Sequence, residues 1–195
     1  VLAGLENTSL ILGGAISGPG GLLFSGYNSS VFMTGTNSNT YTGLTDLSYG
    51  DVYLILKKTN AIAVAGDVWV GKGFNVPGGV TVLRPNQIAD TAKLRFLTNG
   101  WSEHLPVLDL HADDAVRSVE GEADIVAQGH KLIVGTGNAS STLGGFSNFS
   151  YPDPQVEKIG RGDLEISHGL YDLTVSAVEG SVRFNGGDTN ALISV

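Results

Sequence analysis

The densest group of ionisable side chains in this sequence lies between positions 104 and 114. Asp109, Asp113 and Asp114 follow one another closely, with His104 and His111 in the same stretch. Paired carboxylates on one face of a β-rich protein bind calcium or act as acid and base in polysaccharide cleavage. Alternation along a strand would place Asp109 and His111 on the same side. The alternative, which we favour, is that these are solvated residues at a corner of the fold.

Two tryptophans are candidates for stacking on a sugar ring. Trp101 lies in an expected loop and is the better exposed of the two. Trp69 lies between two valines, so its side chain faces away from theirs, and an outward Trp69 would form a ligand or packing surface. The candidate ligand-binding residues are therefore Trp101, Asp109, Asp113 and Asp114.

Other short patterns in the chain have simpler interpretations as turns. Arg161-Gly162-Asp163 matches an integrin-binding tripeptide but falls at an expected Gly-centred turn. The Asn-X-Ser/Thr triplets that begin at Asn7, Asn28, Asn138 and Asn148 are also typical of turns. The sequence contains no Ser/His/Asp pattern, phosphate-binding loop or HExxH motif, and it has no Cys. We therefore expect no catalytic residues, no metal site and no cofactor.

Composition limits the class of protein further. The chain has 195 residues, 42% of them hydrophobic and 15% charged, which fits a single domain over residues 1–195 or a piece of a longer one. A net charge of −8, with 11 Lys and Arg, argues against nucleic acid as a partner. No stretch approaches the roughly 20 apolar residues of a membrane-spanning helix.

Short apolar runs separated by turns predict an all-β fold. The stretch from 37 to 71 sets the pattern, and Gly, at 28 of 195 residues, supplies the turns. The expected strands are Leu10–Leu12, Leu22–Phe24, Val31–Met33, Leu44–Leu47, Val52–Leu56, Val68–Val70, Val80–Leu83, Leu94–Phe96, Val107–Leu110, Val116–Val119, Ala123–Val126, Lys131–Val134, Leu143–Phe149, Leu164–Ile166, Leu173–Val175, Val182–Phe184 and Leu192–Val195.

Self-similarity favours a solenoid over a sandwich or a barrel. A double Gly leads into an apolar run both at Gly20-Gly21 and at Gly78-Gly79. In a parallel β-helix each coil of about 20 to 25 residues contributes two or three strands, and the coils stack at about 4.8 Å. We therefore expect a β-solenoid of stacked short-strand coils.

A series of Gly-rich and apolar elements occurs at Gly20-Gly21-Leu22, Asn39 to Gly43, Gly50 and Leu54 to Leu56, with a second copy from Val156 to Ser167. These elements resemble the autotransporter-associated β-strand repeat of large secreted bacterial proteins. The similarity covers roughly residues 15 to 170, and it departs from the pattern at Ser102 to Pro106 and Ser150 to Pro154. The resemblance implies a right-handed β-helical stalk that is exported and displayed at the cell surface, and it transfers no catalytic residue.

The resulting expectation is a non-enzymatic, extracellular structural or adhesive protein of a bacterial cell surface. One alternative is a β-helical polysaccharide-active enzyme or glycan-binding module, and another is a subunit of a head-to-tail filament. The apolar extremes Val1–Leu5 and Ala191–Val195 lead us to expect contacts with further coils of the same chain or with other copies. Surface glycans and a host or neighbouring cell surface are the other expected partners.

Overall fold

The computed structural model describes residues 2–71, 78–98, 105–144, 155–167, 173–185 and 192–194, and these residues form β-strands joined by turns. A single 3₁₀ turn, Thr136–Asn138, is the one helical element among them, and none of their helices is long and apolar enough to cross a membrane. The strands are β1 (Leu2–Glu6), β2 (Ser9–Leu12), β3 (Leu22–Met33), β4 (Thr45–Leu56), β5 (Val68–Val70), β6 (Gly79–Val82), β7 (Lys93–Phe96), β8 (Val107–Leu110), β9 (Asp114–Val116), β10 (Ser118–Glu122), β11 (Asp124–Val126), β12 (Lys131–Val134), β13 (Ser141–Gly144), β14 (Gln155–Lys158), β15 (Asp163–Ser167), β16 (Thr174–Ala177), β17 (Ser181–Asn185) and β18 (Leu192–Ser194).

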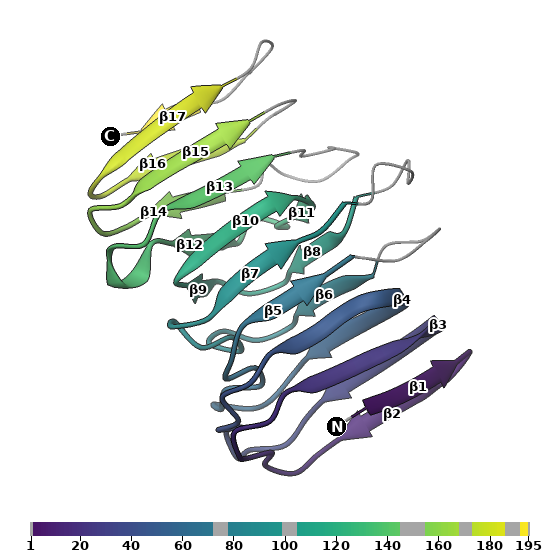
Figure 1. Ribbon diagram of the computed structural model, residues 1–195. Coiled ribbons are helices and arrows are strands. Elements are labelled where there is room, and N and C mark those ends of the chain that lie inside the picture. Colours follow the sequence, from purple (N-terminus) through teal and green to yellow (C-terminus); the bar gives the residue numbers. More distant parts are fainter. Residues whose placement is uncertain are drawn as a thin grey trace.

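The strands stack in parallel to form a right-handed β-solenoid, as expected (Figure 1). The first face consists of β1, the first halves of β3 and β4, then β5, β7, β10, β13, β15 and β17. The second face consists of β2, the second halves of β3 and β4, then β6, β8 and β11. The third face consists of β9, β12, β14, β16 and β18. The polypeptide therefore returns to the same face once in each coil.

Inward side chains of successive coils form continuous apolar columns. Leu47, Val70 and Phe96 occupy equivalent positions on β4, β5 and β7, and none is more than 3% exposed. Alternation along each strand turns the intervening residues outward, as with Trp69 between the buried Val68 and Val70. Burial of such columns supplies the main stabilisation of the fold, at about 25 cal/mol per Å² of apolar surface.

Glycine is required where the backbone of one coil passes close to that of its neighbour. Gly50 has φ +104°, and a Cβ atom there would lie 1.9 Å from the carbonyl oxygen of Gly26 in the previous coil. Gly35 has φ +96°, and its Cβ would lie 2.2 Å from the carbonyl oxygen of Gly13. A larger residue at either position would push two coils apart as well as strain the backbone.

Two expectations about the strands need correction. The strand expected over Val116–Val119 is two strands, because the chain turns from the third face to the first at Arg117. The strands β3 and β4 are each 12 residues long and run from the first face into the second, where separate short strands were expected. Their pairing continues through the corner with shifts in register, so the turn residues there do not end the strand.

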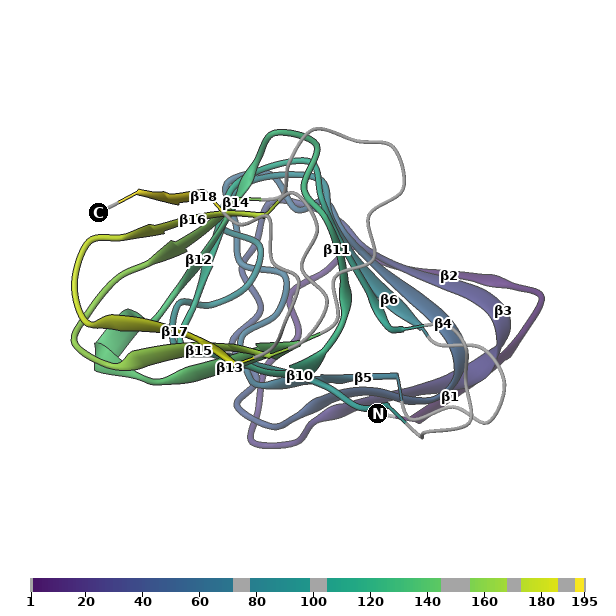
Figure 2. The same cartoon turned by 90° about the horizontal axis from the view of Figure 1, so that it is seen from above.

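Early and late coils of the solenoid have different sheets opposite the first face. In the early coils the opposite sheet is the second face, which ends at β11, whereas from β9 onward it is the third face. Figure 2 shows β2 and β6 on one side and β12, β14, β16 and β18 on the other. The change occurs between β8 and β12, the segment that carries Asp109, Asp113 and Asp114, which we call the aspartate group.

We predict that Gly50→Ala lowers the free energy of unfolding by more than about 3 kcal/mol, through positive-φ strain and the contact with Gly26. Gly14→Ala is the matched control, since a Cβ there meets nothing within 4 Å. We expect the control to stay within about 0.5 kcal/mol of wild type. Urea unfolding at neutral pH measures both, and equal effects of the two substitutions would contradict the stacked arrangement.

Candidate functional site

The aspartate group lies at the corner between the second and third faces. Asp109 is on β8 and Asp114 begins β9, with His111 and Asp113 in the turn between them. Asp109 and His111 point outward on the same side, as alternation predicts, and His111 Nε2 lies 2.9 Å from Asp109 Oδ2. Trp101 and His104 lie outside the described residues.

The next coil supplies a hydrogen-bond partner for the side chains of Asp109 and His111. Gln128 Nε2 donates to Asp109 Oδ1 at 3.2 Å and lies 3.1 Å from His111 Nε2. The proton on His111 Nε2 decides between two contacts. With it, the imidazole donates to Asp109; without it, the imidazole accepts a hydrogen bond from Gln128. The carboxylate of Asp109 therefore has a hydrogen-bond donor in the following coil and, when His111 Nε2 carries the proton, a second donor in its own coil.

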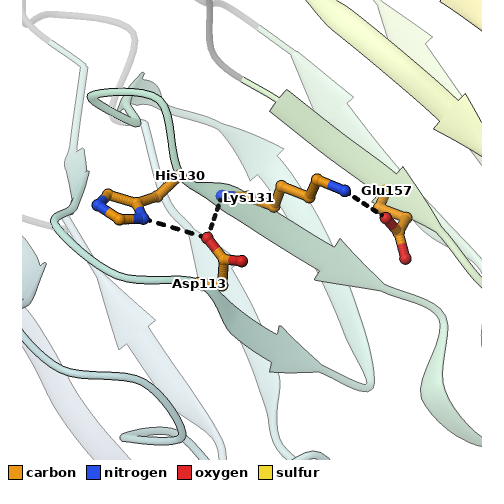
Figure 3. Close-up of polar contacts among 4 residues, drawn as sticks. All are labelled: Asp113, His130, Lys131 and Glu157. Carbon is orange, nitrogen blue, oxygen red and sulfur yellow. Dashed lines mark hydrogen bonds and ion pairs between the residues drawn. The ribbon is translucent and has the colours of Figure 1, made fainter.

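Asp113 connects the corner to two further coils (Figure 3). Its Oδ1 accepts the backbone N–H of Lys131 at 3.0 Å, and His130 Nδ1 lies 3.2 Å from the same oxygen. Lys131 Nζ in turn lies 2.9 Å from Glu157 Oε2, and this carboxylate raises the pKa of the Lys131 ammonium. Polar contacts therefore run from the turn before β9 through β12 to β14.

Asp114 has a different environment from the other two aspartates. It is 2% exposed, and its Oδ2 accepts the backbone N–H groups of Gln87 at 2.9 Å and Ile88 at 3.2 Å. Its Oδ1 accepts the N–H of Ala115 at 2.9 Å. The expectation that all three aspartates are solvated is therefore wrong for Asp114. Its carboxylate accepts hydrogen bonds from backbone N–H groups of the previous coil, at the start of β9, the first strand of the third face.

Burial raises the pKa of the Asp114 carboxyl to about 7. The three N–H groups that it accepts favour the ionised form and lower the pKa, but they offset only part of the effect of desolvation. The nearby charge of Asp90 adds a smaller increase. Asp114 is consequently a carboxyl whose ionisation is linked to the stability of the fold.

The aspartate group binds coils to one another. Asp109 and Asp113 are occupied by side chains and backbone of the next coil, and Asp114 is enclosed by backbone. Among the residues that the structure describes, no three His, Asp or Glu side chains are grouped so as to hold a metal ion. Within the described residues, the contacts of the three aspartates are those of side chains that attach one coil to the next. Of the three carboxylates, those of Asp109 and Asp113 are accessible to solvent and that of Asp114 is buried.

Buried polar residues on the inside of neighbouring corners were missed by the sequence analysis. Lys58, which lies between the expected strands Val52–Leu56 and Val68–Val70, is 0% exposed, and its Nζ donates to the carbonyl oxygens of Gly14 at 2.9 Å and Asn37 at 2.8 Å. Desolvation lowers the pKa of this ammonium. Gln87 links Lys58 to Asp114, because its Oε1 accepts the N–H of Lys58 and its own N–H donates to Asp114. Lys58 continues the inward alternation of Leu54 and Leu56, and that spacing is the signal that could have found it.

Of the Asn-X-Ser/Thr triplets interpreted as turns, those at Asn7 and Asn138 begin in turns, whereas Asn28 lies inside β3 where this strand passes through a corner. Asn7, Asn28 and Asn138 have positive φ angles of 48°, 47° and 64°, which asparagine adopts in tight turns. Asn148 lies outside the described residues. Arg161 and Gly162 form the corner before β15, and the carboxylate of Asp163 accepts a hydrogen bond from the Ser181 hydroxyl of the next coil.

No protein-family model, curated protein or solved structure matches this chain. The resemblance to the autotransporter-associated repeat therefore stays a prediction that depends on its motif residues.

We predict that the stability of the wild type relative to Asp114→Asn decreases as the pH rises from about 4 to about 8. A folded-state pKa above the unfolded value means that the folded state holds the proton more tightly, and this stabilisation disappears as pH passes through the folded pKa. A pKa that moves from about 3.9 to about 7 corresponds to a loss of about 4 kcal/mol. Asn does not titrate, so the difference between the two proteins isolates this group.

Urea unfolding at intervals of pH measures the effect. Asp113→Asn is the matched control, because it removes an exposed carboxyl from the adjacent position. We expect the control to stay within about 0.5 kcal/mol of the wild type. A constant difference between wild type and Asp114→Asn over this pH range would show that the buried carboxyl does not change its ionisation on folding.

Proposed function

We propose that this chain is a segment of an extracellular structural or adhesive protein, displayed on a bacterial cell surface as a β-helical stalk. The observation that carries the proposal is the use of polar side chains along the solenoid. The aspartate group, the one concentration of ionisable residues that suggested chemistry, is occupied in joining successive coils. A solenoid that presents its lateral surface needs no enclosed active site.

The outer surface of the first face supports the same proposal. Glu120 on β10 lies 2.5 Å from Lys93 Nζ and 3.6 Å from Arg95 Nε, both on β7 of the previous coil. On β17, Arg183 lies 3.7 Å from the carboxylate of Asp163 in the coil before it. Exposed pairs of this kind contribute little each, about 0 to 1 kcal/mol, but repeated from coil to coil they favour the in-register stack. These contacts suit a rod whose function depends on its length and lateral surface.

A β-helical polysaccharide-active enzyme is the second candidate. The observation that favours it is the outward pair of Asp109 and His111, which lie 2.9 Å apart and have side-chain exposures of 26% and 37%. Asp114 does not contribute to such a site, because its carboxylate is enclosed by backbone donors. The candidate therefore depends on Asp109 and Asp113 as its acid and base.

We predict that the chain is accessible from outside the intact bacteria that produce it. An epitope tag inserted after Gly129 suits the test, because Gly129 is exposed and a Cβ there would meet nothing within 4 Å. Antibody should label intact cells as strongly as lysed ones, while an antibody to a cytoplasmic protein labels only lysed cells.

Two outcomes would contradict the proposal. One is labelling of the tag only after lysis, which would place the chain inside the cell. The other is release of reducing ends from a polysaccharide by the purified chain, with loss of that activity in Asp109→Asn and Asp113→Asn. This second outcome would support the enzyme.

A further inference from the structure

A groove of about 400 Å³ lies on the outer surface at the corner that leads into the first face. Its walls come from three successive coils: Thr42 and Leu44 precede β4, Asp67 precedes β5 and Thr91 precedes β7. Gly66 is buried at its floor, where a Cβ atom would lie 2.2 Å from the carbonyl oxygen of Gly43. The volume falls within the range of about 300 to 1,000 Å³ that is usual for small-molecule sites.

The indole ring of Trp69 forms an apolar wall of this groove. Its outward direction is fixed, because Val68 and Val70 on either side are both 0% exposed in the core. The guanidinium of Arg95 in the next coil lies 5.5 Å from the centre of the ring, and Arg95 is in turn paired with Glu120. This cation–π contact holds the indole in one orientation and covers one face of the ring, so only the opposite face is left to line the groove.

The polar groups of the groove are side-chain oxygens. Asp67 Oδ1 accepts the backbone N–H of Lys93 at 2.9 Å, which fixes the carboxylate, while Oδ2 makes no hydrogen bond within the described part of the chain. The hydroxyls of Thr42 and Thr91 are exposed and likewise have no partner among the described residues. These three oxygens line the same groove as the fixed indole.

Backbone groups at the groove are already used in stacking. The N–H of Thr42 donates to Gly18 at 3.1 Å, and the carbonyl of Asp67 accepts the N–H of Thr45 at 2.8 Å. An extended peptide binds a sheet through free backbone donors and acceptors of an edge strand, and these two groups are not free. The side chains that the groove offers for recognition are the indole, the two hydroxyls and the carboxylate.

We propose that this groove binds a neutral hexopyranose unit of an oligosaccharide. The apolar C–H face of the sugar ring stacks on the indole face of Trp69 opposite Arg95, and ring hydroxyls donate to Asp67 Oδ2 and exchange hydrogen bonds with Thr42 and Thr91. An anionic sugar is disfavoured, because Asp67 lines the groove and the nearby cations Lys93 and Arg95 both pair with Glu120. This inference goes beyond the proposed function, since it assigns a ligand class and a place on the lateral surface.

Isothermal titration of the 195-residue chain with soluble hexasaccharides tests the proposal. The neutral probes are cellohexaose, mannohexaose and hexa-N-acetylchitohexaose, and hexagalacturonate is the anionic probe. We expect saturable binding of at least one neutral probe and at least about tenfold weaker binding of hexagalacturonate. Trp69→Ala should weaken the neutral interaction by about tenfold or more, and Asp67→Asn by about threefold.

Matched controls distinguish this groove from the rest of the surface. Trp101→Ala removes the other tryptophan, and Thr142→Ala changes an exposed residue of β13 on the same face, so both should stay within about twofold of wild type. If circular dichroism shows that Trp69→Ala is unfolded, Trp69→Phe replaces it. We expect Trp69→Phe to retain binding within about fivefold, because the aromatic surface remains.

The proposal is overturned by any of three results. The first is absence of saturable binding for all three neutral probes, and the second is unchanged affinity in folded Trp69→Ala. The third is loss of binding in Trp101→Ala with retention in Trp69→Ala, which would place the sugar site at the other tryptophan. Because binding is measured on the purified chain, these results do not depend on whether the protein is displayed at a cell surface.

Discussion

The structure depends on one constraint: each coil must pair in register with the coil beneath it through backbone hydrogen bonds. Every described pairing between strands is parallel, and the residues paired between β6 and β8, such as Val80 and Leu108, lie one coil apart. Because the backbones meet at about 4.8 Å, a residue faces its equivalent in the next coil, and close approaches at corners require glycine, as at Gly50. Side-chain columns, turn positions and polar contacts all follow from this repeat.

The same constraint explains why the aspartate group, the densest group of ionisable side chains, lies where the solenoid changes from its second face to its third. Where the second face gives way to the third, the N–H groups of Gln87 and Ile88 lack a strand partner in the next coil, and the buried carboxylate of Asp114 accepts both. Outside the same corner, Asp109 and Asp113 attach to the next coil. A buried donor left without an acceptor costs about 1 to 3 kcal/mol, so a solenoid that changes its cross-section needs polar side chains at the point of change.

The sequence predicted the fold because alternation and turn residues are local signals. It correctly placed the side chains of Asp109 and His111 on the same side, although His111 lies in the turn after β8, and it identified Trp69 as facing away from its two valine neighbours. It did not predict the burial of Asp114 or Lys58, because a polar residue normally indicates an outward position, and the donors and acceptors that hold these two belong to other coils. Such contacts depend on which residues the stacking brings together. The groove beside Trp69 was missed for the same reason, since its walls come from three coils.

The most direct test of this account is disulfide cross-linking of outward residues on the first face, because the native chain has no Cys. Thr142 on β13 and Glu165 on β15 are register partners, whereas Arg183 on β17 is the partner of Glu165 and lies one coil beyond. Parallel partners at about 4.8 Å are within reach of a disulfide, but residues two coils apart, at roughly 9.6 Å, are not. We predict that mild oxidation links Thr142→Cys to Glu165→Cys within one chain and leaves Thr142→Cys with Arg183→Cys unlinked. Linkage of the second pair, or failure of the first, would contradict the register of the stack.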